Sequence, residues 1–258
     1  MKIVLLFVFL LSTSLFAKEA PKTKIKIAAI DWCPQICPTD KLNPGFLVEM
    51  IKDIFSSGPY ELEFEYLPWS RAIYNVERGY ADALLSPSKD EAPGLIYHKE
   101  NLSFQTHCFW KSKDSLWNFS GVDSLGSIKF VVYRDHPYGT LLNDYFNKYK
   151  TDHYFEFSFD ENYIDRAITF LQKGRAQSFL DTANSVAYHL KKKGIRSIVR
   201  DACIKQDELW LGLSPKNGKR TDDLRAYIDA HLHDFKNSER YQFLMKKYQI
   251  SFPPLMKF

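Results

Sequence analysis

Hydrophobic positions in the first third of the chain alternate between strand-like and helix-like spacing. Apolar residues at 47, 48, 51, 54 and 55 predict an amphipathic helix over residues 46–55. A second helix is predicted over residues 70–78, with Ser70 as its N-cap and Gly79 ending it. Short apolar or alternating runs predict strands at residues 25–30, 61–67 and 81–85. This order of elements predicts parallel βαβ units and an α/β fold.

The same pattern returns 95 residues later. Residues 70–86 (SRAIYNVERGYADALLS) and residues 165–181 (DRAITFLQKGRAQSFLD) match at Arg, Ala, Ile, Gly, Ala and Leu. Each segment predicts a helix, a basic residue beside a helix-ending glycine, and a short strand that ends in a polar residue. The repeat predicts two lobes of similar build. Chance similarity is the alternative, because any helix–glycine–strand unit shares some of these features.

The remaining pattern places the lobe boundaries. Residues 128–133 and 141–149 predict a strand and a helix that open the second lobe, and residues 111–126 predict a crossing loop. Residues 104–110 and 209–213 are candidate linking strands, and residues 222–248 predict a long helical stretch that returns to the first lobe. We therefore predict a two-lobe fold joined by a two-strand hinge, with each lobe a βαβ-rich mixed sheet flanked by helices. The predicted divisions are residues 18–111 plus 206–258 for lobe 1, and residues 112–205 for lobe 2.

Composition excludes several classes of protein. Hydrophobic residues make up 45% and charged residues 26% of 258 positions, which is ordinary for a globular chain with a real core. Aromatic residues reach 16%, which excludes disorder and coiled coil. A formal charge of +4 is too small and too interspersed to predict nucleic-acid binding.

The N-terminus predicts export. Lys2 precedes an uninterrupted apolar run over residues 3–11, and a small residue, Ala17, marks the expected cleavage point. This pattern is typical of a secretory signal peptide over residues 1–17, and the run is too short to span a bilayer. We therefore expect a periplasmic protein. As a separate expectation, we take it to be a monomer.

The four cysteines predict disulfides in that oxidising compartment, where three connectivities are possible. Cys33 and Cys37 lie close enough to close a small loop, which leaves Cys108 and Cys203 as the second pair by elimination. The C-x3-C spacing differs from a redox C-x2-C, and no His follows at zinc-finger spacing. We predict neither a metal nor a cofactor.

Polar and aromatic residues follow the predicted strands and form the candidate site. In an open parallel sheet, ligands bind beyond the carboxyl ends of the strands. Aromatic walls, a cation for a carboxylate and a carboxylate for an amine suit a small polar or zwitterionic ligand. The candidate ligand-binding residues are Trp32, Trp69, Arg71, Ser86, Arg134, Tyr138, Gly139, Thr140 and Asp181.

Each candidate has a structural alternative. The tryptophans could belong to the lobe cores, and Arg71 could pair with Glu77 or Asp82 on its own surface. Asp181 could cap a helix beginning near Thr182. Gly139 and Thr140 could be turn residues only.

The order of landmarks resembles the bacterial extracellular solute-binding proteins of family 3, the polar-amino-acid-binding subunits of ABC importers. The resemblance covers nearly all of the chain after the predicted signal peptide. Its landmarks are Trp32-Cys33-Pro34, Gly45-Phe46, Gly79 with Asp82, Ser124-Leu125 with Ile128, Gly139-Thr140, Gly174-Arg175-Ala176, Asp181 and a helix over 241–248.

The resemblance implies a role for each matching residue. Trp32 and Trp69 would wall the ligand, and Ser86 would hydrogen-bond it. The helix start at Gly139 and Thr140 would receive a carboxylate through its amides. Asp181 would receive the α-amino group.

One segment departs from the family pattern. Amino-acid binders of this family place an Arg shortly after the third strand to clamp the ligand carboxylate, whereas residues 88–93 here read SKDEAP. Arg71 or Arg134 would have to substitute, so the ligand could be an amino acid, a modified amino acid, an amine or another polar metabolite.

The resemblance implies a binding protein without turnover, with an ABC permease as its partner. A sensory or interaction module without a transporter is the first alternative. A lyase or dehydratase on the same scaffold is the second, for which Asp135 and His136 would be the acid–base candidates, although no His–carboxylate spacing stands out.

Overall fold

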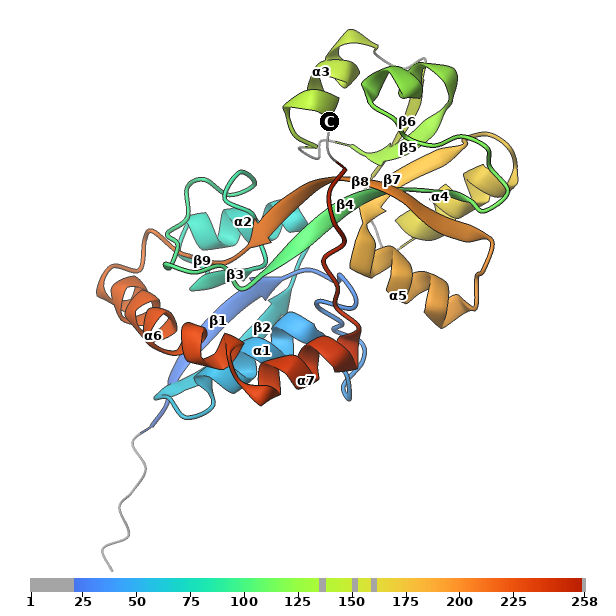
Figure 1. Ribbon diagram of the computed structural model, residues 1–258. Coiled ribbons are helices and arrows are strands. Elements are labelled where there is room, and N and C mark those ends of the chain that lie inside the picture. The colour runs from blue at the N-terminus through green and yellow to red at the C-terminus, as the bar shows by residue number, and fades with distance from the viewer. Residues whose placement is uncertain (1–20, 135–137, 150–152, 159–161, 257–258) are drawn as a thin grey trace, which may run out of the picture.

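The computed structural model describes residues 21–134, 138–149, 153–158 and 162–256. Its strands form two sheets, each flanked by helices (Figure 1). The predicted signal peptide over residues 1–17 lies outside the described residues, as do Asp135 and His136. No helix in the described part of the chain has the length and apolar character needed to cross a membrane.

The first sheet has the strand order β2-β1-β3-β9. Strand β1 pairs in parallel with β2 and β3, and β9 pairs antiparallel with β3. Its elements are β1 (Thr23–Ala29), α1 (Phe46–Phe55), β2 (Tyr60–Tyr66), α2 (Trp69–Glu77), β3 (Ala83–Leu85) and β9 (Leu211–Leu213). The predicted strands and the helix over 46–55 are confirmed to within two residues at each end.

The second sheet has the order β6-β5-β7-β4-β8. A buried cluster rich in Phe and Tyr fills the space between this sheet and its helices, which explains the high aromatic content. The elements are β4 (Ser103–Ser112), a 3₁₀ helix (Val122–Ser127), β5 (Phe130–Tyr133), α3 (Thr140–Lys148), β6 (Tyr154–Phe157), α4 (Tyr163–Gln172), β7 (Ser178–Thr182), α5 (Ala183–Lys193) and β8 (Ile198–Leu209).

The sequence repeat corresponds to one strand in each sheet. Strand β3 lies between parallel β1 and antiparallel β9, and strand β7 lies between parallel β5 and antiparallel β4. Helix α2 precedes β3, as α4 precedes β7. The two sheets therefore share one topology, with β8 as an additional edge strand of the second.

Two long strands connect the sheets. Strands β4 and β8 pair antiparallel from Ser103 opposite Leu209 to Ser112 opposite Ile198, and they run between the two halves in Figure 1. After β8 the chain passes through Trp210 into β9, which joins the first sheet. The disulfide Cys108–Cys203 links β4 to β8, with Cα atoms 3.9 Å apart. Both predicted disulfides are confirmed.

The C-terminal helices pack on the first sheet, as predicted, but they are two rather than one. Helix α6 (Lys219–Lys236) and helix α7 (Glu239–Tyr248) lie beside α1 in Figure 1 and contribute to the same core. The break comes at Ser238, whose hydroxyl accepts a hydrogen bond from the Tyr241 amide at 3.2 Å and so caps α7.

The segment after α7 crosses to the second sheet. Ser251 donates its amide to the Asn184 side chain at 3.0 Å, and Phe252 packs edge-on against Phe104. The Met256 amide donates to the carbonyl of Cys203 at 2.7 Å. This segment forms a third crossing, in addition to the two predicted linking strands.

The prediction that Ser70 caps a helix is wrong. Helix α2 begins at Trp69, and the carbonyl of Pro68 accepts the first helical hydrogen bond, from Ala72 at 2.9 Å. Trp69 therefore belongs to the helix, and its membership fixes which helix face the following residues occupy.

Candidate functional site

A cleft of about 450 Å³ lies between the two sheets. Its volume is within the range of small-molecule sites. Both sheets contribute side chains, and the lining mixes aromatic, acidic and hydroxyl groups. The lining residues are Ile30, Trp32, Trp69, Ile73, Ser86, Asp90, Glu91, Gln105, His107, Tyr133, Arg134, Asp181 and Thr182.

The cleft lies at the carboxyl ends of parallel strands, where an open α/β sheet binds ligands. Ile30 and Trp32 follow β1, Ser86 follows β3, Arg134 follows β5, and Asp181 and Thr182 end β7. Five of the nine predicted residues therefore line it: Trp32, Trp69, Ser86, Arg134 and Asp181.

Trp32 stands at the base of a loop that is fixed at several points. Its backbone exchanges hydrogen bonds with Ile36 at 2.8 and 2.9 Å, and the disulfide Cys33–Cys37 closes the same turn. Gly45 ends the loop with a φ of +113°, and a Cβ there would lie 2.4 Å from the carbonyl oxygen of Gln35. Only glycine fits this position. The loop thus holds one aromatic wall of the cleft.

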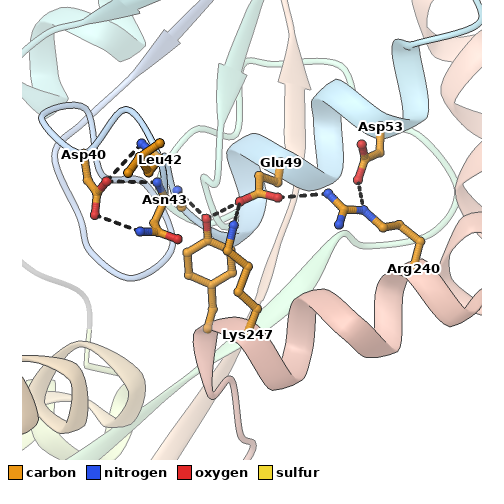
Figure 2. Close-up of polar contacts among 9 residues, drawn as sticks. Asp40, Leu42, Asn43, Glu49, Asp53, Arg240 and Lys247 are labelled. Carbon is orange, nitrogen blue, oxygen red and sulfur yellow. Dashed lines mark hydrogen bonds and ion pairs between the residues drawn. The ribbon is translucent and has the colours of Figure 1, made fainter.

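Helix α7 anchors the other end of that loop (Figure 2). The Gly45 amide donates to the Tyr248 hydroxyl at 3.2 Å, and that hydroxyl donates to Glu49 of α1. Burial acts to raise the pKa of Glu49, but hydrogen bonds from Lys247 and Tyr248 outweigh it and lower the pKa. Arg240 joins Glu49 to Asp53 at 2.9 and 2.6 Å. The C-terminal helix therefore supports the wall that carries Trp32.

Trp69 and Ile73 line the cleft from one face of α2. Arg71 does not line it and is exposed. Residues two apart on a helix point in nearly opposite directions, because each residue turns by about 100°. With Trp69 inside the helix and lining the cleft, Arg71 lies on another face of α2, and the structure does not bear out the expectation that Arg71 faces the cleft.

Ser86 combines an unusual backbone with an unsatisfied side chain. Its φ is +72°, a conformation that non-glycine residues rarely adopt and that often marks functional sites. The residue is 4% exposed, and its Oγ has no hydrogen-bond partner in the described chain. Trp210 holds this backbone, since its carbonyl accepts from Ser86 at 2.9 Å and its amide donates to Pro87 at 3.0 Å.

Asp181 is fully buried inside β7 rather than after it. Oδ1 accepts a hydrogen bond from the Thr182 amide at 2.5 Å, whereas Oδ2 lacks a partner of good geometry in the described chain. Burial raises the pKa of Asp181 to about 7, against the effect of hydrogen bonds from the Thr182 amide and the Tyr133 hydroxyl. Thr182, and not Asp181, occupies the N-cap of α5. The helix-cap alternative is therefore wrong.

Two carboxylates that the sequence analysis did not select also line the cleft. Asp90 is exposed at its edge, and Glu91 is partly buried. Oε2 of Glu91 accepts from the Ser88 amide at 3.0 Å and from the Ser88 hydroxyl at 2.9 Å. Burial outweighs these bonds and raises the pKa of Glu91. Acidic groups thus occupy the segment in which the family resemblance led us to look for an Arg.

The linking strand β4 supplies Gln105 and His107, which point to the same face because they are two residues apart. His107 is buried and lies 3.1 Å from Asp207, which also pairs with Lys205 at 2.9 Å. Burial opposes the charge of Asp207, but the contacts with His107 and Lys205 lower its pKa. His107 and Lys205 are therefore both engaged with Asp207.

Tyr138, Gly139 and Thr140 do not line the cleft. Tyr138 is a core residue whose hydroxyl accepts from the Tyr133 amide at 2.8 Å. Gly139 has a φ of +86° before α3, with the Lys205 side chain 3.7 Å from where its Cβ would be, and Thr140 is exposed. The helix start that was expected to receive a carboxylate is therefore not part of the cleft lining, and the Lys205 side chain lies beside it.

Within the described chain, no three His, Cys, Asp or Glu side chains gather in a way that could hold a metal ion. The arrangement offers aromatic surfaces, hydroxyls and carboxylates, which recognise a ligand through stacking, hydrogen bonds and charge.

Comparison with solved structures identifies the fold. The GluR0 ligand-binding core in complex with L-glutamate aligns with a TM-score of 0.70 and 16% identity, over 89% of this chain and 99% of that one. A histidine kinase sensor domain with similarity to periplasmic binding proteins gives 0.68 and 17%, over 88% and 96%. A mutant of ArgBP from T. maritima gives 0.66 and 17%, over 88% and 95%.

The chain has the fold of periplasmic binding proteins. No family model matches the sequence, and no curated protein matches it. At these identities the likeness shows the fold alone. The predicted fold class is confirmed, and what the cleft binds must be argued from its own residues.

Proposed function

We propose that this protein is a periplasmic solute-binding protein that captures a small polar ligand, an amino acid or a related amine or carboxylate, in the cleft between its lobes. One observation carries the proposal. Ser86 Oγ and Asp181 Oδ2 are buried at equivalent places in the two sheets and line the same cleft; Ser86 Oγ has no partner in the described chain, and beside Asp181 Oδ2 the side-chain donor is the hydroxyl of Tyr133, which also lines the cleft. Unsatisfied buried polar groups are costly, so a ligand that pairs with both would stabilise the protein.

A transport role follows from this proposal. The predicted signal peptide would export the protein, and an ABC permease would be its partner. Hinged lobes of this kind close around their ligands, and β4 and β8 supply the connection that such a motion needs. A sensor without a transporter would use the same closure.

A thermal-shift screen of amino acids, amines and organic acids tests the binding proposal, followed by calorimetry of each hit. A ligand at 100 times its Kd should raise the unfolding free energy by about 2.7 kcal/mol. Asp181→Asn should lose most of that effect, and Arg71→Ala, which lies outside the cleft, should keep it. If no compound in a broad panel stabilises the wild-type protein, the proposal is wrong.

The two acidic residues also favour a second candidate, a lyase or dehydratase. Glu91 and Asp181 have raised pKa values in one cleft, which suits proton transfer near neutral pH. NMR of a bound ligand recovered after long incubation separates the two functions: binding returns it unchanged, whereas catalysis returns a product.

A further inference from the structure

We infer that the ligand is an organic cation with N–H donors, an ammonium or a guanidinium, and that the cleft does not require a carboxylate on it. The inference rests on the proposed binding function and deepens it by assigning the ligand's charge. It depends on which charged groups are buried, which acceptors are unpaired, and where the candidate carboxylate receptors lie.

Two of the three acidic residues that line the cleft are less exposed than its arginine. Asp181 is fully buried and Glu91 is partly buried, whereas Arg134 is exposed. Asp90 adds a third carboxylate at the edge. A desolvated carboxylate is stabilised by a cation far more than by a neutral group. The interior of the cleft therefore favours positive charge.

The unpaired buried atoms require donors. Asp181 Oδ2 can only accept hydrogen bonds when it is ionised, and Ser86 Oγ can accept as well as donate. An ammonium carries three N–H donors and a guanidinium five, and neither accepts. One such group between the two sheets could satisfy both atoms.

The cleft has few positively charged groups that could bind a ligand carboxylate. Of the candidate receptors, Arg71 and the helix start at Gly139 and Thr140 lie outside the described lining, which leaves exposed Arg134. His107 also lines the cleft, but it lies against Asp207 at 3.1 Å. The lining hydroxyls and Gln105 could hydrogen-bond a ligand carboxylate, but the charged partner that the described lining offers it is the arginine at the edge, where water screens the interaction.

The aromatic walls suit a cation as well. Trp32, Trp69 and Tyr133 line the cleft beside the acidic groups. Indole and phenol rings attract cations to their faces, most strongly where water is excluded. The same walls would accommodate the methylene chain of a longer amine.

Matched ligands that differ only by a carboxylate test the inference. Calorimetry at pH 7.5 compares agmatine with arginine and cadaverine with lysine. At least one amine should bind at least tenfold more tightly than its amino acid. Glu91→Gln and Asp181→Asn should each weaken that amine at least tenfold, and Arg71→Ala should not change its affinity. The unfolding temperature of each variant establishes that it is folded.

The outcomes separate this inference from the proposed function. If an amino acid binds tenfold more tightly than its amine, or if only neutral or anionic compounds bind, the cation inference is overturned and the binding function stands. If Glu91→Gln and Asp181→Asn both keep the amine affinity while folded, the assignment of the acidic groups is overturned. If no compound binds at all, the proposed function itself fails.

Discussion

Strands β3 and β7 occupy the same place in their sheets, yet they deliver different groups to the cleft. The end of β3 presents Ser86, a neutral hydroxyl on a backbone with a φ of +72°. The equivalent position of β7 presents Asp181, a fully buried carboxyl in an extended strand. The first sheet therefore has a strained backbone at the site. The second sheet has a carboxyl group whose ionisation is unfavourable because it is buried.

The supports of the two strand ends differ in the same way. Ser86 is held through its backbone by Trp210, which lies between β8 and β9. Asp181 is held by core side chains: Trp110 donates to its carbonyl at 3.3 Å, and the Tyr163 hydroxyl donates to Leu180 at 3.0 Å. The conformation of Ser86 thus depends on the segment that connects the two sheets, whereas the position of Asp181 depends on the core of the second sheet.

The largest expected effect concerns the disulfide between two strands of the second sheet. Cys108–Cys203 joins β4, the neighbour of β7, to β8 across 95 residues of sequence. Loop-closure entropy predicts a loss of about 4–5 kcal/mol in unfolding free energy for Cys108→Ser with Cys203→Ser, and about 2 kcal/mol for the pair Cys33→Ser with Cys37→Ser. Urea denaturation measures both. A larger loss for the short loop would contradict the entropic argument.

The second prediction concerns the charge of Asp181. Because its folded pKa is raised to about 7 from an ordinary 3.8, the ionised carboxyl destabilises the empty fold above pH 7. Asp181→Asn should therefore stabilise the empty protein by on the order of 4 kcal/mol at pH 8, and this gain should vanish as pH falls toward 4. Binding of an amine-bearing ligand should weaken by about 2–4 kcal/mol.

Chemical denaturation across this pH range, with calorimetry of the ligand, measures both halves of that prediction. The two effects have opposite signs, which separates a functional carboxyl from a structural one. If Asp181→Asn destabilises the empty protein at pH 8 and leaves affinity unchanged, Asp181 is structural.

The third prediction concerns His98 of the first sheet, whose effect on stability should change with pH in the opposite direction to that of Asp181. His98 is buried, accepts a hydrogen bond from the Leu211 amide of β9 at 3.2 Å, and burial lowers its pKa to about 4. A histidine with a lowered pKa contributes stability above its unfolded value of 6.5, and that stability is lost as pH falls to 4. The loss should be about 3 kcal/mol.

Acidification should thus act on the two lobes in opposite directions, stabilising around Asp181 and destabilising around His98. Hydrogen exchange measured at pH 7 and pH 5 resolves the lobes separately. Equal changes of protection in β7 and β9 would contradict the assignment.

The fold could be predicted because it follows from local pattern. The spacing of apolar residues gave α1 at residues 46–55 without error, and the repeat at Asp165–Asp181 corresponds to the shared sheet topology. The break between α6 and α7 was missed, since a single N-cap serine does not interrupt a helical pattern over residues 222–248.

The site could be predicted only in part, because the direction in which a side chain points depends on where its helix begins and on how its strand pairs. Once Trp69 lies inside α2, Arg71 falls on another face of that helix, but the sequence analysis placed the N-cap at Ser70, two residues after the observed N-cap at Pro68. Gln105 and His107 were missed, although two polar residues at alternate positions of a buried strand were the available signal. Glu91 was missed because the search of residues 88–93 was for a cation.

The smallest expected effect concerns the strain at Ser86. Left-handed backbone costs a non-glycine residue about 1–2 kcal/mol, and glycine avoids this cost but loses more entropy on folding. Ser86→Gly should therefore stabilise the empty protein by up to about 1 kcal/mol, whereas Ser86→Ala keeps the strain and should not. Both variants remove Oγ, so both should weaken ligand binding by about 0.5–1.5 kcal/mol, the scale of one neutral hydrogen bond. The difference in unfolding free energy between the two variants measures the effect of the backbone strain. The loss of affinity that both variants share in calorimetry measures the contribution of the hydroxyl. If Ser86→Ala binds the ligand as tightly as the wild-type protein, the hydroxyl makes no contact with it, and the strained backbone must then serve to place Pro87 against Trp210.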